Sequence, residues 1–198
     1  MRKILPLLAA LAAACLMTPA QAQTSGGYAG VGVMTVSTDN ASDFGYVFAT
    51  SGERTATGLK VYAGYLWNRF GVEVGHYNLG SYDVYNGGTK SSEFSTSATT
   101  VSGVFAMPIA SQFVFNAKAG LAFADVEYTC ISLCTSTEFS SSKSSVTGLI
   151  GAGVGWRPAP NFTLRADLET FTNVLHRAGV NEAYYPYSTF SVSGQVNF

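Results

Sequence analysis

The chain has 198 residues, of which 47% are hydrophobic and 13% aromatic, whereas only 12% are charged. Soluble domains carry about 25% charged residues, and disordered chains combine low hydrophobicity with high net charge. The composition therefore excludes disorder and is unusual for a soluble domain. The 11 Lys and Arg residues nearly balance the 12 Asp and Glu residues, which argues against a nucleic-acid-binding protein. The length suits a single domain.

The N-terminal segment has the pattern of a secretory signal peptide. Two basic residues precede an apolar stretch, and the triplet Ala20-Gln21-Ala22 supplies the small residues at which signal peptidase cuts. The apolar stretch is shorter than the ~20 residues that a membrane-spanning helix needs. We expect residues 1–22 to be cleaved and residues 23–198 to form the mature domain.

After the signal peptide, hydrophobic residues recur at every second position in stretches of about ten residues. This alternation is typical of β-strands that have two different faces. The sequence predicts eight strands, at residues 27–37, 57–67, 70–81, 97–107, 112–125, 146–156, 161–172 and 187–198.

The connections between these predicted strands alternate between short turns and long loops. The short turns lie at 68–69, 108–111 and 157–160. The long connections are rich in Ser, Thr, Asn, Gly and Tyr, and they lie at 38–56, 82–96, 126–145 and 173–186. In an up-and-down arrangement all short turns lie at one end, which is the asymmetry of outer-membrane barrels.

Each predicted strand has one apolar face and one face of small, polar or charged residues. A lipocalin-like soluble barrel, the alternative fold, would turn the apolar face inward around a ligand, whereas a membrane barrel turns it toward lipid. The polar faces carry three charges of each sign, on Lys60, Lys118, Arg165, Glu73, Asp167 and Glu169. Such balance suits a narrow interior, because an unpaired buried charge costs several kcal/mol. The sequence therefore predicts an all-β fold, an eight-stranded antiparallel up-and-down transmembrane β-barrel with these six residues as an interior ion network.

Three segments resemble hairpins of the OmpA-like transmembrane β-barrel family. They are AGYLWNRFGVEVGHYNLG (63–80), VFAMPIASQFVFNAKAGLAFADVEY (104–128) and GAGVGWRPAPNFTLRADLETF (151–171). The resemblance covers essentially the whole mature chain. It implies one of the small, barrel-only outer-membrane proteins, without a periplasmic peptidoglycan-binding domain. The alternating C-terminal end resembles the family's signal for the barrel-assembly machinery, here Phe190, Val192, Val196 and Phe198.

The resemblance also implies roles for some inward residues. The family's interior ion-pair positions are matched by Glu73, Lys118, Arg165 and Asp167. Val104 and Gly155 stand where the family has gate-forming Lys and Glu residues, so we do not expect the family's salt-bridge gate here.

We expect a structural or surface-interaction role, in adhesion or recognition, through four long extracellular loops. A narrow porin-like channel is the first alternative, because the inward glycines Gly151, Gly153 and Gly155 leave internal space. A lipid-modifying outer-membrane enzyme is the second. Its only candidate His bases are His76, expected on the lipid-facing side, and His176 in a loop. No triad, metal-ligand or phosphate-binding motif is present, so we expect no catalysis, cofactor or metal.

The predicted loops hold a second group of candidate residues. Cys130 and Cys134 are spaced C-x3-C in an exported chain, which predicts a loop disulfide. Tyr-rich segments resemble adaptable binding surfaces, and the tyrosines concerned are Tyr82, Tyr85, Tyr184, Tyr185 and Tyr187. The expected partners are outer-membrane lipids and lipopolysaccharide, the barrel-assembly machinery during biogenesis, and a host or cell-surface ligand. We expect a monomer in the bacterial outer membrane.

Overall fold

The computed structural model describes residues 25–38, 51–52, 55–86, 88–131, 140–178 and 181–198. The predicted signal peptide lies outside these residues. The strands are β1 (Ser25–Thr38), β2 (Ser51–Gly52), β3 (Thr55–Trp67), β4 (Phe70–Asn86), β5 (Thr89–Pro108), β6 (Phe113–Cys130), β7 (Ser140–Ala159), β8 (Phe162–Ala178) and β9 (Asn181–Asn197). In the described part of the chain, no helix is both long enough and apolar enough to cross a membrane.

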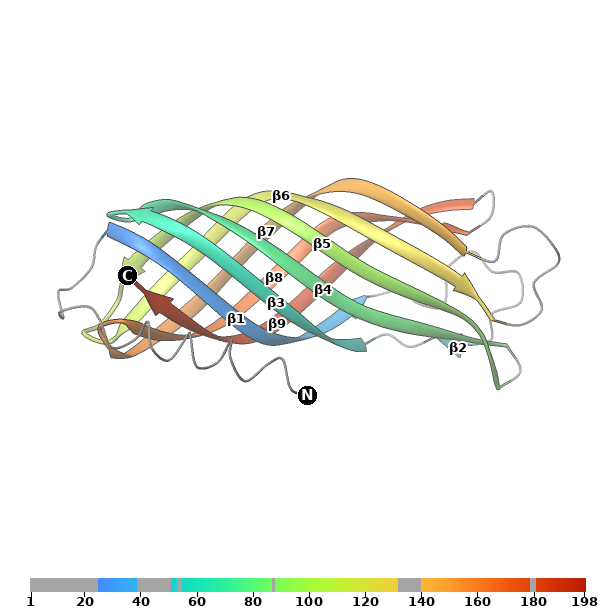
Figure 1. Ribbon diagram of the computed structural model, residues 1–198, viewed down its shortest axis with the longest axis horizontal. Coiled ribbons are helices and arrows are strands. Elements are labelled where there is room, and N and C mark those ends of the chain that lie inside the picture. Colours follow the sequence, from blue (N-terminus) through green and yellow to red (C-terminus); the bar gives the residue numbers. More distant parts are fainter. Residues whose placement is uncertain (1–24, 39–50, 53–54, 87, 132–139, 179–180) are drawn as a thin grey trace.

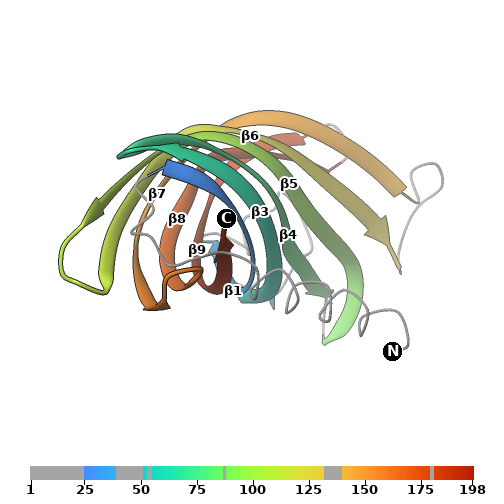
Figure 2. The ribbon, with the colours of Figure 1, turned by 60° about the vertical axis from the view of Figure 1, so that its left-hand side comes forward.

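Eight of these strands form a closed antiparallel barrel (Figures 1 and 2). Each long strand pairs with the next in the chain, β4 pairs with β5, and β9 returns to pair with β1 from Tyr28↔Asn197 to Thr38↔Tyr187. The short strand β2 adds one further pairing, to β4. Closure satisfies the backbone hydrogen bonds of every barrel strand, as a lipid environment requires. The predicted fold class is confirmed.

The strands are longer than the sequence predicted at one end of the barrel. The three short turns lie at the end we call the turn end, which also holds the C-terminus (Figure 1). At the opposite end, the hairpin end, β4 continues to Asn86 and β5 begins at Thr89. Most of the predicted loop at 82–96 is therefore strand, and the predicted loops at 126–145 and 173–186 are shortened in the same way. The Ser- and Thr-rich segments lack hydrophobic alternation, but their backbones pair regularly, as from Ser92↔Cys130 onward.

Two register shifts explain why alternation ends where it does in the sequence. In β4 the register shifts between Asn78 and Ser81, where Gly80 has φ +87° and its N–H donates to Asn78 Oδ1 at 3.0 Å. In β8 the register shifts between Phe171 and Val174. A bulge adds a residue to one strand and reverses which side chains point inward beyond it. The predicted strands end at 81 and 172 because the period-two pattern is interrupted there.

The outer wall is apolar. Exposed Val, Leu, Ile and Phe side chains form a band around it, with Leu168 65% and Ile150 56% exposed. Aromatic side chains are exposed near the turn end, among them Tyr65, Trp67, Phe70 and Trp156. A lipid-facing band flanked by an aromatic girdle is the surface of a transmembrane β-barrel.

Candidate functional site

The barrel interior consists of two layers of buried side chains. The first, which we call the charge layer, contains Lys60, Glu73, Lys118, Arg165, Asp167 and Glu169, all at most 6% exposed. The second, which we call the apolar layer, lies closer to the hairpin end. The six charges that alternation placed on inward faces therefore lie together inside the barrel.

One part of the charge layer is centred on Lys60, from β3. Its Nζ lies 2.8 Å from Asp167 Oδ2 and 3.2 Å from Glu169 Oε2, both on β8. The two carboxylates are two positions apart on one strand, so both side chains point inward at successive levels. Lys60 thus links β3 to β8 across the barrel interior.

The other part is centred on Glu73, from β4. Its Oε1 accepts from Lys118 Nζ at 2.9 Å, and its Oε2 accepts from Arg165 Nη1 at 3.1 Å. Lys118 also pairs with Glu169, and Arg165 Nη2 lies 3.2 Å from Asp167 Oδ1. All three carboxylates are shared between cations, so the six residues form one continuous network that joins four strands.

Uncharged residues that the sequence did not single out complete this network. Tyr28 donates to Glu73 Oε2 at 3.0 Å, and Tyr77 donates to Glu169 Oε1 at 2.9 Å. Asn116 Oδ1 and Gln195 Oε1 accept from Arg165 at 3.2 and 3.1 Å. The Tyr62 ring lies 5.0 Å from the Arg165 guanidinium carbon. Each of these residues lies at an inward-facing position of its strand. A search of the sequence for polar residues at inward-facing positions would therefore have found them.

Tyrosines and carboxylates fill the space above the interior glycines. Tyr28 is opposite Gly64, and Tyr62 is opposite Gly30 across the β1–β3 ladder. In both pairs the ring lies where a Cβ on the glycine would be. At Gly153 the same position is occupied by an Asp167 oxygen and backbone. At Gly151 and Gly155, the other two glycines that supported an open channel, the side chains of Glu169 and Thr163 occupy this position.

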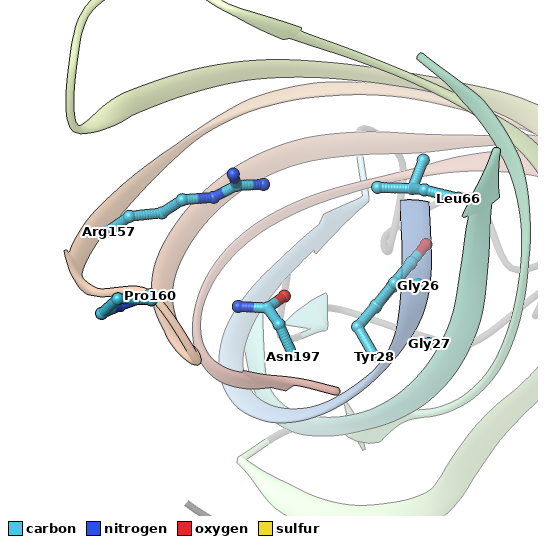
Figure 3. A pocket seen from close by; sticks show the side chains of 7 residues that line it. All are labelled: Gly26, Gly27, Tyr28, Leu66, Arg157, Pro160 and Asn197. Atoms are coloured by element: carbon cyan, nitrogen blue, oxygen red, sulfur yellow. The ribbon is translucent and has the colours of Figure 1, made fainter. Parts of the chain in front are cut away.

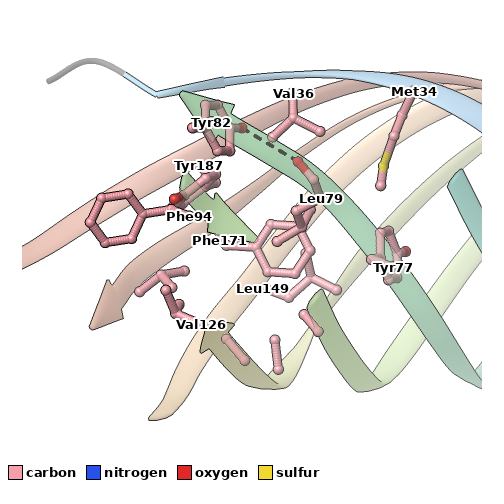
Figure 4. Packing of buried hydrophobic residues seen from close by; sticks show 14 residues of the cluster. Met34, Val36, Tyr77, Leu79, Tyr82, Phe94, Val126, Leu149, Phe171 and Tyr187 are labelled. Carbon is pink, nitrogen blue, oxygen red and sulfur yellow. Dashed lines mark hydrogen bonds between the residues drawn. The ribbon is translucent and has the colours of Figure 1, made fainter. Parts of the chain in front are cut away.

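The apolar layer closes the interior toward the hairpin end (Figure 4). Its members are Met34, Val36, Tyr77, Leu79, Tyr82, Phe94, Ala98, Ala122, Ala124, Val126, Leu149, Phe171, Val174 and Tyr187. Tyr77 and Phe171 pack edge to face with ring centroids 5.4 Å apart, and Tyr82 and Tyr187 do so at 5.8 Å. The packing joins strands from all sides of the barrel, so the layer fills the interior across its width.

The apolar layer corrects the prediction that the loop tyrosines are exposed. Tyr82 and Tyr187 are fully buried inside the barrel. The bulge in β4 turns Tyr82 inward, and Tyr187 continues the inward alternation of β9, opposite Phe171. Tyr184 is 61% exposed at the hairpin end, as a surface residue would be. Tyr85 lies near Asp83, with its hydroxyl 3.5 Å from Oδ2. For Tyr185 only the backbone is described, in β9.

The remaining predicted site residues are placed as follows. His76 lies on the outer wall, with Nδ1 3.2 Å from Thr99 Oγ1. His176 lies in β8 and Cys130 ends β6, but their side chains are outside the described part, as is all of Cys134. The predicted disulfide therefore stays a prediction. Of the predicted C-terminal signal residues, Phe190, Val192 and Phe198 are exposed, whereas Val196 is buried.

A surface ion cluster lies at the hairpin end. Lys90 Nζ is 2.7 Å from Asp83 Oδ1 and 2.9 Å from Glu93 Oε2, joining β4 and β5. Its hydrogen bonds to these carboxylates raise the pKa of Lys90 above its ordinary value. Here the side chains are 24 to 37% exposed, so water and salt screen the charges.

Comparison with known proteins identifies the family. Residues 22–196 match the OmpA-like transmembrane domain. The chain belongs to this family. It is accordingly an outer-membrane β-barrel. In such barrels the short turns lie in the periplasm and the longer connections lie outside the cell. A comparison with curated proteins found no match.

Solved structures with the same fold are also small outer-membrane barrels. Neisserial surface protein A has a TM-score of 0.64 at 17% identity, over 88% of this chain and 98% of that one. OprG from Pseudomonas aeruginosa has a TM-score of 0.60 at 13% identity, over 91% and 99%. Ail, the attachment invasion locus protein of Yersinia pestis, has a TM-score of 0.52 at 18% identity, over 87% and 99%. Identities this low support a shared fold.

Proposed function

We propose that this barrel is a structural outer-membrane protein whose extracellular hairpins recognise a ligand on another surface. The proposal rests on the observation that side chains fill the barrel interior. The charge layer and the apolar layer occupy successive levels of the barrel, as expected for eight strands. With the interior taken up by packing, the parts of the molecule available to a ligand are its outer ends.

The hairpin end supports this role by its length and composition. The strands continue beyond the lipid-facing band, and they present Ser, Thr and Tyr side chains to solvent. Such side chains provide hydrogen bonding and contact area at binding surfaces. The structure thus supplies a rigid β-scaffold for the extracellular tips.

The charge of the hairpin end indicates the kind of ligand. The segments 38–56, 82–96, 126–145 and 173–186 contain eight acidic and four basic residues, a surplus of four negative charges. Complementary potentials steer association, and like charges oppose it. The proposed ligand is therefore a cationic or neutral surface group. One structure of Ail contains the heparin analogue sucrose octasulfate, but the acidic hairpin end of this chain does not favour a sulfated ligand.

A cell-adhesion experiment tests the proposal. Gram-negative cells displaying the protein should adhere to cultured epithelial cells, and replacement of residues 131–139 by a short Gly-Ser turn should reduce adhesion at least tenfold. This replacement leaves the buried Val126 of the apolar layer in place. A heat-modifiable gel shift verifies that the variant barrel is folded. Sucrose octasulfate should not compete. Adhesion equal to that of cells lacking the protein would contradict the proposal.

The enzyme alternative has little geometric support in the described residues. His76 is on the outer wall and contacts Thr99, with no carboxylate in the interaction. Substituting both His76 and His176 with Ala should leave lipid composition unchanged, as measured by mass spectrometry of isolated outer membranes. A change in acylation that depends on either histidine would favour the enzyme alternative.

We further infer that residues 1–22 direct export and that the C-terminal strand is read by the barrel-assembly machinery. The lipid-facing exposure of Phe190, Val192 and Phe198 supports the second step, since a surface motif is accessible during assembly. N-terminal sequencing of the protein from outer membranes should begin at Gln23. Retention of Met1 would contradict cleavage.

A further inference from the structure

The periplasmic end of the interior contains a small cavity below the charge layer. Its volume is about 30 Å³, and it is lined by Arg165 of the charge layer and by Arg157, near the end of β7. A second cavity of about 20 Å³ also has Tyr28, Leu66 and Arg157 on its wall and lies at the barrel mouth (Figure 3). In Figure 3 the Arg157 side chain extends from the barrel wall over this mouth. The cavity is therefore reached from the periplasmic side.

Two buried cationic N–H groups at this cavity lack partners. Arg165 is 5% exposed, and its Nε has no hydrogen-bond partner even though its Nη atoms are fully engaged. Arg157 Nε is likewise buried without a partner. Buried donors almost always have a partner in native proteins, so a shared cavity next to two unpartnered N–H groups indicates a bound species.

The charges around the cavity favour a bound species that carries a negative charge. The charge layer is balanced, with three cations and three carboxylates. Arg157 takes part in none of the ion pairs among the described residues, so it adds one positive charge at the edge of the interior. Among the described residues, the other charges at this end are exposed Arg69 and the terminal carboxylate of exposed Phe198. Arg157 is half-buried, so a water molecule would satisfy the donors, whereas an anion would satisfy them and also offset the charge of Arg157.

The size and walls of the cavity restrict which anion fits. About 10 to 15 Å³ by this measure holds one water-sized sphere, so 30 Å³ admits a monatomic anion but not a phosphate group with its hydration. Val104, Ala106 and Val114 make much of the wall apolar. Thr163 also lines the cavity, and because its Oγ1 accepts from Asn197 Nδ2 at 3.0 Å, its own proton is available to a further acceptor.

From these observations we propose that the cavity binds one monovalent anion of the size of chloride, held between Arg157 and Arg165. The anion completes the charge balance of the interior at its periplasmic end. Because the site exists only in the folded barrel, a bound halide stabilises the folded state in proportion to its concentration relative to Kd. Val104 and Gly155 form part of its wall.

Bromide provides a direct probe of the site. Crystals of the refolded barrel grown in sodium bromide should show an anomalous peak in the cavity, within hydrogen-bonding distance of both Nε atoms. Arg157→Gln should abolish the peak. Arg69→Gln removes the same charge from an exposed turn at the same end of the barrel, so the peak should persist in this matched control.

Chloride-35 NMR of the detergent-solubilised protein gives an independent readout in solution. We expect excess line broadening that saturates with chloride for the wild type and for Arg69→Gln, and an affinity at least tenfold weaker for Arg157→Gln. All three proteins must show the heat-modifiable shift of a folded barrel. A cavity that contains only water in bromide crystals, or equal chloride affinity in all three proteins, would overturn the proposal.

Discussion

The two layers of the barrel interior fill the same kind of space by different means. In the charge layer each side chain depends on specific partners, as Glu73 depends on Lys118 and Arg165. In the apolar layer, residues such as Leu149 and Phe171 are held by contact with many neighbours. Removing one charged partner leaves another charge buried, whereas removing one apolar group leaves a cavity. The same barrel wall therefore supports both forms of packing. The two layers should respond differently to substitution of a single residue.

The largest effect is expected in the charge layer. Glu73→Gln keeps the shape of the side chain but removes the charge that Lys118 and Arg165 share. Removing one partner of a buried ion pair costs roughly 3 to 5 kcal/mol. We expect a loss of that size in the free energy of unfolding, measured by urea titration in phospholipid vesicles with tryptophan fluorescence.

The matched control is Glu93→Gln at the hairpin end. Lys90 and Glu93 lie 2.9 Å apart, the same distance as Lys118 and Glu73, but their side chains are 34% and 37% exposed instead of 2%. Exposed ion pairs contribute less than about 1 kcal/mol. Equal losses for the two Glu→Gln variants would show that burial does not distinguish these pairs.

A somewhat smaller effect is expected in the apolar layer. Leu149→Ala removes a fully buried side chain, and a loss of about 3 kcal/mol in unfolding free energy follows from the transfer and cavity costs. Leu168→Ala, on the lipid face of the neighbouring strand, should cost less, because lipid chains occupy the vacated volume. If Leu168→Ala were the more damaging of the two, the interior position of the apolar layer would be wrong.

The smallest of these three losses in stability is expected for Tyr77, which contacts both layers. Tyr77 donates to Glu169 and accepts from Lys118 at 2.8 Å, while its ring packs on Phe171. Tyr77→Phe keeps the ring and removes the hydroxyl, so we expect a loss of roughly 1 to 2 kcal/mol in urea unfolding. Tyr65→Phe on the outer wall is the control and should be close to neutral. A Tyr77→Phe loss as large as that of Glu73→Gln would remove the distinction between the layers.

The two layers also differ in how far the sequence revealed them. The charge layer follows from alternation, since Lys60, Glu73 and Arg165 are conspicuous on inward faces of regular strands. Part of the apolar layer does not, because Tyr82 and Val174 follow register shifts that reverse the alternation. Tyr82 consequently resembled a loop residue, whereas Tyr187, at the start of a predicted strand, keeps the inward alternation of β9. Packing between residues that are far apart in the sequence produces no periodic pattern in either segment.

The length of the strands at the hairpin end and the residues that line the cavity also could not be predicted from the sequence. Strand length at the hairpin end comes from backbone pairing between Ser- and Thr-rich segments, which side-chain patterns do not encode. Arg157 was part of a predicted turn, and only the three-dimensional structure brings it to the same cavity as Arg165. The sequence was sufficient for the fold class and the inward charges, and insufficient for contacts set by barrel closure.

Because the charge layer and the apolar layer close the interior, we propose that the protein acts through its surfaces. Planar-bilayer recording of the refolded wild-type protein tests whether the interior is closed. We expect a membrane without discrete conductance steps at either polarity, with folding verified by the heat-modifiable shift of protein recovered from the same preparation. Uniform, reproducible conductance steps would show that the interior is open and would favour a narrow channel.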